Sequence, residues 1–222
     1  MLYFLAISKM LAGVGIFLLG MSFLEDALRK LAGRSFKLFL RNQTTNKFKA
    51  IAGGAIVTGV LQSSSVVNLM VLAFVGAGVI TMQNALAVIL GSNIGTTLTS
   101  WLVASLGFAF NIELFSLPIV GIAGLAMALI QSNNRAYYWC KFLFGFGALF
   151  LGLDYMKGSF GDLAGQLDFS SLQGYPAILF VLIGFILTSI IQSSSATVAI
   201  ALSALHADAI SLYSATAIVL GS

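Results

Sequence analysis

Two identical polar tetrapeptides lie within long apolar stretches of this chain. The sequence Gln-Ser-Ser-Ser occurs at Gln62–Ser65 and again at Gln192–Ser195. Serine hydroxyls and glutamine amides can donate hydrogen bonds to an anion or turn an oxygen lone pair toward a small cation. At membrane depth such groups persist only where they pair with one another or line a cavity. The duplication therefore predicts one polar, ion-binding site that is assembled from two related halves.

A helix that breaks at each run would favour anion binding further. The second half-helix would begin at the serines, and its first backbone N–H groups would have no partner within the helix. A helix N-terminus carries about half a positive charge and readily binds anions. The alternative interpretation is that the serines only join neighbouring helices by hydrogen bonds.

A third polar motif follows the first run, because residues Gly91–Thr97 read Gly-Ser-Asn-Ile-Gly-Thr-Thr. We interpret its two glycines as a break in a helix. Its Ser, Asn and Thr oxygens would then suit Na⁺, since hard cations prefer oxygen ligands. The alternative is a packing face of small residues. Thr58 and Thr188, one helical turn before each Gln, either face the same cavity or bond the backbone carbonyl four residues back.

The elements that position these motifs are expected to be membrane helices. The 222 residues are 59% hydrophobic and 8% charged, whereas about 25% of the residues of a typical soluble domain are charged. The apolar start, Met1–Gly20, lacks a basic region and a cleavage site. We therefore interpret it as a retained span and not as a signal peptide. The single cysteine, Cys140, excludes a disulfide within the chain.

Basic residues are concentrated in one loop. Seven of the eleven Lys and Arg residues lie between Arg29 and Lys49. Such an excess in a short loop indicates the cytoplasmic side of a membrane and argues against nucleic acid as a partner. This orientation places the N-terminus outside. Glu25 and Asp26 end the first apolar stretch, so we expect them at the membrane interface.

The chain contains an internal repeat. Residues 50–92 align with residues 180–222 at a constant offset of 130, and 15 of the 43 paired positions are identical, including both polar runs. Further upstream, glycines and the Leu-Ala-Gly at residues 31–33 align at an offset of 132. We predict one repeat over residues 1–135 and a second, incomplete repeat over residues 136–222.

The lengths of the apolar stretches predict the topology. A spanning helix needs about 20 apolar residues, but Ala50–Ile80 has 31, which is too long for one span and too short for two. We predict re-entrant helical hairpins at about residues 50–80 and 176–206, which turn at the serines. Three crossings plus one hairpin per repeat would invert the second repeat relative to the first. The predicted fold is an all-α, polytopic membrane protein with inverted repeats, embedded in a lipid bilayer.

The combination of motifs resembles the bacterial Na⁺/phosphate cotransporter family, which is related to the animal type II Na⁺-dependent phosphate cotransporters. The resemblance rests on the paired Gln-Ser-Ser-Ser runs and on the Gly-Ser-Asn-Ile-Gly-Thr-Thr that follows the first of them, and it covers essentially the whole chain. It implies a non-enzymatic symporter of inorganic phosphate in the bacterial inner membrane. Such a symporter works by alternating access, with Na⁺ as the coupling ion and no other cofactor.

The resemblance places the substrate and ion sites at the two runs. The residues expected to bind phosphate are Gln62, Ser63, Ser64, Gln192, Ser193, Ser194 and Asn93. The residues expected to bind Na⁺ are Ser65, Ser195, Ser92, Thr96, Thr97, Thr58 and Thr188. No Lys, Arg, Asp or Glu lies between Ala50 and Asn111 or between Pro176 and Leu205. We therefore expect helix ends, hydroxyls and bound Na⁺, rather than an arginine clamp, to balance the charge of phosphate.

The sequence departs from the family at its end. Family members continue the second repeat with another Asn-x-Gly-Thr-Thr-like stretch and further helices, and some bacterial members add a soluble phosphate-regulatory domain. The sequence stops at Gly221-Ser222, where that stretch should begin. A transport-inactive or regulatory fragment is therefore an alternative function. A homodimer and the regulatory domain are the protein partners that we consider.

Three other functions are weighed against the symporter. A Na⁺-coupled transporter of another small anion would have the same motifs. A passive channel is disfavoured because the polar runs occur at two localized sites and not along one face of a span. An intramembrane serine enzyme would need a base within about 3 Å of a serine. His206 is the only histidine and lies well beyond Ser195 in the chain, so we expect no enzyme.

Overall fold

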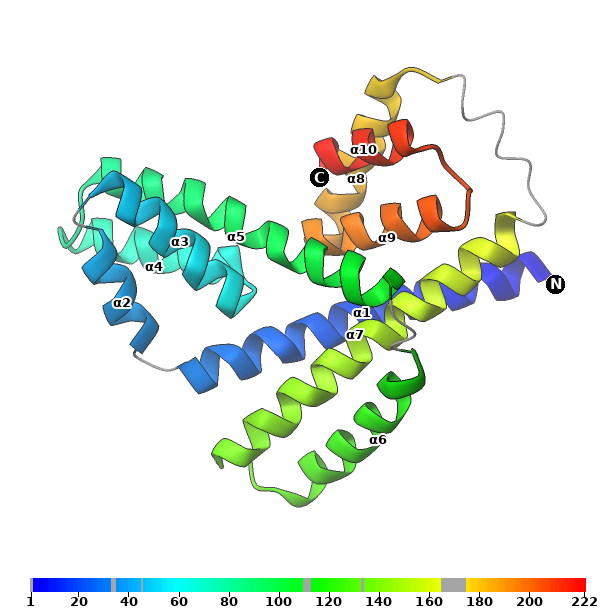
Figure 1. The fold of residues 1–222 in the computed structure, drawn as a ribbon, viewed down its shortest axis with the longest axis horizontal. Coiled ribbons are helices and arrows are strands. Elements are labelled where there is room, and N and C mark those ends of the chain that lie inside the picture. Colours follow the sequence, from blue (N-terminus) through cyan, green and yellow to red (C-terminus); the bar gives the residue numbers. More distant parts are fainter. Residues whose placement is uncertain (1, 33–34, 45, 110–112, 133, 165–174) are drawn as a thin grey trace. The chain divides into compact units, whose positions relative to one another are not determined.

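The computed structural model describes residues 2–32, 35–44, 46–109, 113–132, 134–164 and 175–222 (Figure 1). These residues form helices, turns and short connections and include no strand, so the all-α prediction is confirmed for them. The helices are α1 (Leu2–Ala32), α2 (Ser35–Gln43), α3 (Lys47–Leu61), α4 (Ser64–Gly76), α5 (Met82–Ala109), α6 (Glu113–Leu129), α7 (Arg135–Ala164), α8 (Ala177–Ile191), α9 (Ser194–His206) and α10 (Leu212–Gly221).

Three of the described helices are long and apolar enough to cross a membrane. The candidate spans are Phe4–Ala32, Met82–Phe108 and Arg135–Ala164, and they are consistent with a membrane protein. The helices on either side of each polar run have only 13 or 15 residues. At 1.5 Å per residue such a helix is about 20 Å long, which is less than the hydrocarbon thickness of about 30 Å. None of these four helices is therefore long enough to cross by itself.

The chain divides into two compact units that are interleaved in sequence. Unit 1 comprises Met1–Met21, Val103–Val120 and Gly145–Ser222, and unit 2 comprises Ser22–Leu102 and Gly121–Phe144. Helices α2, α3 and α4 belong to unit 2, and α8, α9 and α10 belong to unit 1. Each unit therefore contains one Gln-Ser-Ser-Ser run. The predicted repeat boundaries and the inversion of the repeats stay predictions.

The helix breaks at both polar runs in the same way. After α3, Gln62 adopts the left-handed conformation (φ 57°, ψ 21°) and Ser63 is extended (φ −143°, ψ 103°) before α4 begins. After α8, Gln192 (φ 59°, ψ 26°) and Ser193 (φ −146°, ψ 107°) precede α9 with nearly the same angles. Left-handed backbone is uncommon for residues other than glycine. The predicted breaks are thus confirmed, and they share one local geometry.

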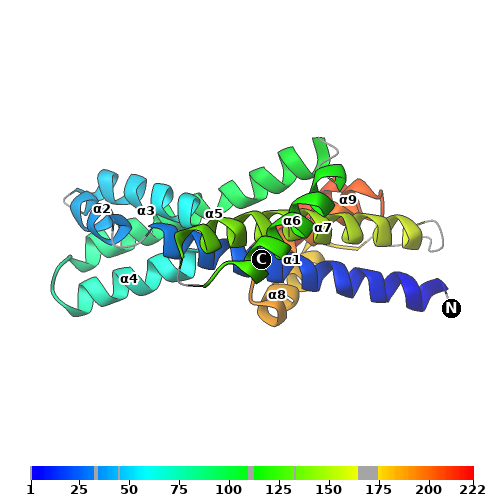
Figure 2. The ribbon, with the colours of Figure 1, turned by 90° about the horizontal axis from the view of Figure 1, so that it is seen from below.

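The helix pairs that follow the breaks are also alike. In unit 2, α3 lies beside the first half of α5 (Figure 1 and Figure 2), and a Cβ atom on Gly54 would collide with the backbone of Val88. In unit 1, α8 packs against α10, and a Cβ atom on Gly184 would collide with the backbone of Ile218. The offset that relates the two polar runs also relates these two contacts. The close approach of these helices therefore depends on glycine at equivalent positions.

The predicted break within Gly91–Thr97 is wrong, because α5 continues without interruption from Met82 to Ala109. The glycines serve another purpose, since Cβ atoms on Gly91 and Gly95 would collide with the carbonyls of Ile51 and Ala55 in α3. Without Pro and with its i→i−4 backbone bonds intact, the segment has no cause to break. The alternative interpretation, a packing face of small residues, is confirmed for Gly91 and Gly95.

Each unit has its own apolar core. In unit 2 the core joins α2 to α5 and includes Leu40, Val57, Val67, Val71 and Val88. In unit 1 one cluster joins α1, α5, α7 and α9, and it includes Phe17, Val103, Leu149, Leu153 and Met156. A smaller cluster in unit 1 joins α8, α9 and α10. These cores hold the short helices, and thereby the two breaks, in place.

Candidate functional site

The N-terminus of α4 lacks the cap that α9 has. The hydroxyl of Ser193 accepts a hydrogen bond from the backbone N–H of Ala196 at 3.3 Å. Its counterpart Ser63 makes no such bond to α4. The first N–H groups of a helix have no partner within the helix and favour a nearby negative charge. In the first run these donors therefore lack the side-chain acceptor that the second run supplies.

The side chain of Gln62 is held between two helices. Its amide nitrogen donates to the carbonyl of Gly59 in α3, and its amide oxygen accepts from the hydroxyl of Thr99 in α5 at 2.6 Å. The amide nitrogen of Gln192 likewise donates to the carbonyl of Ser189, at 2.7 Å. Both glutamines therefore bond the carbonyl three residues before them, which stabilises the left-handed turn.

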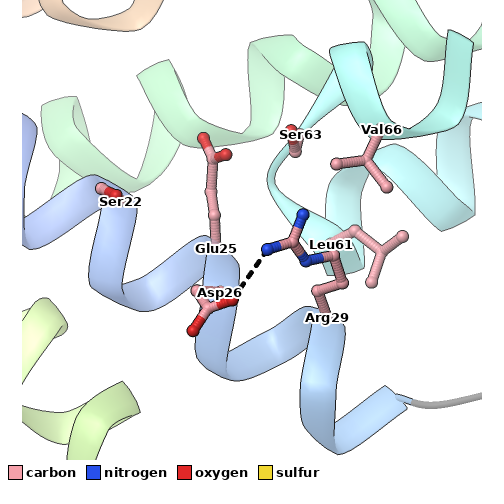
Figure 3. A pocket seen from close by; sticks show the side chains of 7 residues that line it. All are labelled: Ser22, Glu25, Asp26, Arg29, Leu61, Ser63 and Val66. Carbon is pink, nitrogen blue, oxygen red and sulfur yellow. Dashed lines mark hydrogen bonds and ion pairs between the residues drawn. The ribbon is translucent and has the colours of Figure 1, made fainter. Parts of the chain in front are cut away.

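A pocket of about 220 Å³ lies beside Ser63 (Figure 3). This volume is far above the roughly 10–15 Å³ that one water molecule needs. Ser63 is 9% exposed, and in Figure 3 Glu25 and Arg29 extend from α1 toward it. The residues that line the pocket are Ser22, Glu25, Asp26, Arg29, Leu61, Ser63 and Val66.

The charged groups around this pocket form a network within unit 2. Arg29 donates to the Asp26 carboxylate at 2.8 Å, and the ammonium group of Lys141 in α7 donates to the other oxygen of the same carboxylate. Lys141 also lies 5.1 Å from the centroid of the Phe23 ring. Glu25 interacts with the Ser63 side chain. This pocket therefore contains a basic residue, Arg29, and the expectation of a phosphate site without an arginine clamp stays a prediction.

The α1 residues of the pocket were not predicted as site residues. Ser22, Glu25, Asp26 and Arg29 occur at positions i, i+3, i+4 and i+7, a spacing that places them on one face of a helix. We interpreted the two acidic residues as interfacial, because they end an apolar stretch. A polar stripe in the last three turns of a span is the signal that identifies them.

The predicted ligands on α5 do not line this pocket. Ser92 is fully buried, donates to the carbonyl of Ile89 at 2.8 Å and lies 3.3 Å from the side-chain oxygen of Asn68. Thr96 and Thr97 donate to carbonyls of their own helix at 3.0 and 2.7 Å. Asn93 lies on the exposed side of α5. Ser92 thus forms a hydrogen bond to a side chain of another helix, that of Asn68 in α4.

Thr58 and Thr188 are equivalent in sequence but differ in their hydrogen bonds. The hydroxyl of Thr188 donates to that of Thr197 at 2.8 Å. At the offset of 130, Thr197 corresponds to Val67, which has no hydroxyl. Thr58 is completely buried, and its hydroxyl has no hydrogen-bond partner among the described residues. An unsatisfied buried polar group costs about 1–3 kcal/mol, and an ion or a water molecule commonly satisfies such a group.

The remaining predicted residues belong to the two breaks. Ser64 and Ser194 are the first residues of α4 and α9, and Ser65 and Ser195 follow them. The first run lies in unit 2 and the second in unit 1, so a site shared by both runs stays a prediction. The described residues contain no group of three or more His, Cys, Asp or Glu side chains that could hold a metal ion.

Comparison with known proteins identifies relatives of this chain. A protein of Bacillus subtilis (strain 168) named "Uncharacterized protein YqeW" is 32% identical over 215 residues, which are 93% of this chain and 66% of that protein. The "Putative inorganic phosphate export protein YjbB" of Salmonella typhimurium is 25% identical over 222 residues, 98% of this chain and 40% of that protein. The human "Sodium-dependent phosphate transport protein 2C" is 47% identical over 57 residues, 26% of this chain and 10% of that protein.

The chain thus spans less than two thirds of the length of these relatives. No solved structure is significantly similar to it. The model of one protein family, described as Na+/Pi-cotransporter, matches residues 16–158, a range that includes the first polar run, α5 and most of α7. This match, which covers more than half of the chain, shows that the chain belongs to the Na+/Pi-cotransporter family.

Proposed function

We propose that this chain forms the substrate-binding part of a Na⁺-coupled symporter of inorganic phosphate, which works by alternating access in the bacterial inner membrane. The observation that supports this most is the repeated break at the two Gln-Ser-Ser-Ser runs, with one backbone geometry in both. Within its own unit, each break brings the start of a helix together with the serine hydroxyls of the run, and both kinds of group can bind an anion.

Each polar run is proposed to be the tip of a re-entrant hairpin. The helices on both sides of each run are too short to cross a bilayer alone. A chain that turns at the run would enter and leave on the same side. Two hairpins in repeats of opposite orientation would bring both tips near the middle of the membrane, where secondary transporters of several folds bind their substrates.

Phosphate is proposed to bind the N-termini of α4 and α9 through Ser63, Ser64, Ser193 and Ser194, with the side chains of Gln62, Gln192 and Asn93. A bare divalent anion loses its hydration on entering this environment, which costs several kcal/mol or more. A bound Na⁺ would offset much of this cost, because the pair is closer to neutral than the anion alone. Coupling would then follow from the need for Na⁺ in the loaded site.

Na⁺ is proposed to bind hydroxyl oxygens near the breaks and on α5. Thr58 supports this most directly, because its buried hydroxyl has no hydrogen-bond partner among the residues that the structure describes. The other proposed ligands are Ser65, Ser92, Thr96, Thr97, Thr188 and Ser195. The name of the Salmonella relative refers to phosphate export. Efflux is therefore the alternative direction for this chain, and loaded vesicles would detect it in the same assay.

Ser64→Ala and Ser194→Ala are each expected to lower Na⁺-driven phosphate uptake at least about tenfold, because each removes one hydroxyl that donates to a buried anion, worth about 1.5–3 kcal/mol. Uptake of radioactive phosphate into proteoliposomes measures this. Ser8→Ala is the matched control, since Ser8 lies within an apolar span and donates to the carbonyl of Leu5 in its own helix. Normal uptake in both Ser64→Ala and Ser194→Ala would refute the paired site.

Thr58→Val is expected to stabilise the Na⁺-free protein by about 1 kcal/mol, because it replaces an unsatisfied buried hydroxyl by a methyl group of similar size. Thr188→Val is expected to destabilise it by a similar amount, because it breaks the bond to Thr197. Melting temperatures without Na⁺ test both. In Na⁺, Thr58→Val should lose part of the stabilisation that the ion provides. A lower melting temperature of Thr58→Val without Na⁺ would contradict the assignment.

A further inference from the structure

We propose that the pocket beside Ser63 is a bipolar subsite that binds phosphate and its coupling cation together. Arg29 would hold the oxyanion, and Glu25 would hold the cation with the hydroxyls of Ser22 and Ser63. This inference rests on the proposed function and adds a site on α1 to it. All residues of the subsite belong to unit 2.

Arg29 is placed to bind an oxyanion. Its guanidinium group extends into the pocket, where Asp26 accepts one hydrogen bond from it at 2.8 Å (Figure 3). A guanidinium has five N–H donors in a planar fork, so a single contact with Asp26 leaves donors for the two oxygens of a phosphate. The contact also fixes the orientation of the side chain.

Lys141 keeps the net charge of the cluster around Arg29 positive. Asp26 alone would neutralise the guanidinium, but Lys141 donates to the same carboxylate. Two cations therefore share one anion, and the three groups together carry one net positive charge. Lys141 is 16% exposed at its side chain and also lies against the Phe23 ring. It is thus a positioning residue that holds Asp26 and does not face the pocket itself.

Glu25 supplies the opposite charge on the same pocket. It lies within salt-bridge distance of no residue that the structure describes, and it interacts with the Ser63 side chain and, electrostatically, with Arg29. An ionisable group within a candidate span is costly unless it has a partner or a function. Its carboxylate and the hydroxyls of Ser22 and Ser63 offer the oxygen ligands that a small hard cation prefers.

The two charges together explain why the pocket suits an ion pair. The net positive charge of the Arg29 network and the negative charge of Glu25 balance, so an isolated anion or cation would be repelled by one side. A phosphate with an adjacent Na⁺ matches both. Ser63 joins this pocket to the uncapped start of α4. The subsite and the first polar run are therefore continuous.

The second repeat does not reproduce this subsite. At the upstream offset of 132, Glu25 corresponds to Lys157 and Arg29 to Gly161. Lys157 donates to the carbonyl of Gly107 and lies 4.8 Å from the centroid of the Phe108 ring. The bipolar pocket is therefore specific to the first run and makes the two halves of the site unequal.

Binding of radioactive phosphate to the full chain in lipid nanodiscs, over a series of Na⁺ concentrations, tests this inference. Arg29→Gln is expected to lower phosphate affinity at saturating Na⁺ at least about tenfold, and Arg29→Lys to restore part of it, because lysine keeps the charge but not the fork. Glu25→Gln is expected to raise the half-saturating Na⁺ concentration at least about tenfold. Glu25→Asp is expected to raise it less, because aspartate keeps the carboxylate. Arg41→Gln and Asp208→Asn are controls at exposed positions outside the pocket.

The possible outcomes distinguish a failure of the proposed subsite from a failure of the proposed function. If Arg29→Gln and Glu25→Gln bind phosphate with the same affinity and Na⁺ dependence as the unsubstituted chain, while Ser64→Ala binds phosphate more weakly, the subsite is wrong and the proposed function stands. If Glu25→Gln strengthens phosphate binding without changing its Na⁺ dependence, Glu25 only repels the anion and the cation side is wrong. If the unsubstituted chain binds no phosphate in Na⁺, both proposals fail. Melting temperatures identify variants that do not fold. If Arg29→Gln or Glu25→Gln does not fold, phosphate binding by Arg29→Lys or Glu25→Asp tests the subsite in its place.

Discussion

Replacing Na⁺ by choline is expected to weaken phosphate binding about 100-fold or more, which corresponds to about 2.8 kcal/mol. The reason is the charge of the proposed site. The positive charge of Arg29 is balanced by Glu25 across the pocket. The other hydrogen-bond donors of the proposed site are hydroxyls, amides and the starts of α4 and α9. These groups offset part of the desolvation of phosphate, and the cation must offset the rest. Choline is too large to bind between hydroxyl oxygens.

Equilibrium binding of radioactive phosphate to the purified chain, with NaCl exchanged for choline chloride at constant ionic strength, measures this effect. Constant ionic strength matters because salt alone screens charge. KCl is a second control, since K⁺ is larger than Na⁺ and separates a fitted cation site from a general need for positive charge. Equal phosphate affinity in Na⁺ and in choline would show that the site does not use a cation, and the symport proposal would fail.

The helix breaks were predictable because they have a simple physical cause. Consecutive Gln and Ser residues in an apolar stretch have few ways to be satisfied at membrane depth, and a turn with a new helix start is one of them. The identical run at Gln192–Ser195 made the same prediction for the second break. The left-handed backbone of Gln62 and Gln192 was not predictable, since Gly and Asn are the usual residues there.

The error at Gly91–Thr97 shows which information a sequence lacks. Glycine and small hydroxyl residues occur both where a membrane helix breaks and where two helices approach closely. Here Gly91 and Gly95 meet the backbone of α3, and the hydroxyls of Ser92, Thr96 and Thr97 bond carbonyls of their own helix. Only the position of α3 distinguishes the two cases. The Arg29 pocket was missed for the same reason, because its parts come from α1 and from the distant break between α3 and α4.

Valine in place of Gly54 or Gly184 is expected to lower the stability of the folded protein by about 3 kcal/mol or more, at the upper end of what overpacking costs where side chains can move aside. A side chain at Gly54 meets the backbone of Val88, and one at Gly184 meets the backbone of Ile218. Backbone atoms of a helix cannot rotate away, so α3 and α5, or α8 and α10, would have to separate.

Gly121→Val in unit 2 and Gly15→Val in unit 1 are matched controls, because both glycines lie within helices and a Cβ atom on either meets nothing within 4 Å. Their effect should stay within about 0.5 kcal/mol. Unfolding of the purified variants in a series of detergent mixtures measures the difference. Each helix break lies next to one of these helix pairs, so Gly54→Val and Gly184→Val should both abolish phosphate binding as well as lower stability. Equal stability of Gly54→Val and Gly121→Val would show that α3 and α5 do not depend on glycine for their contact, and the first break would then need another support.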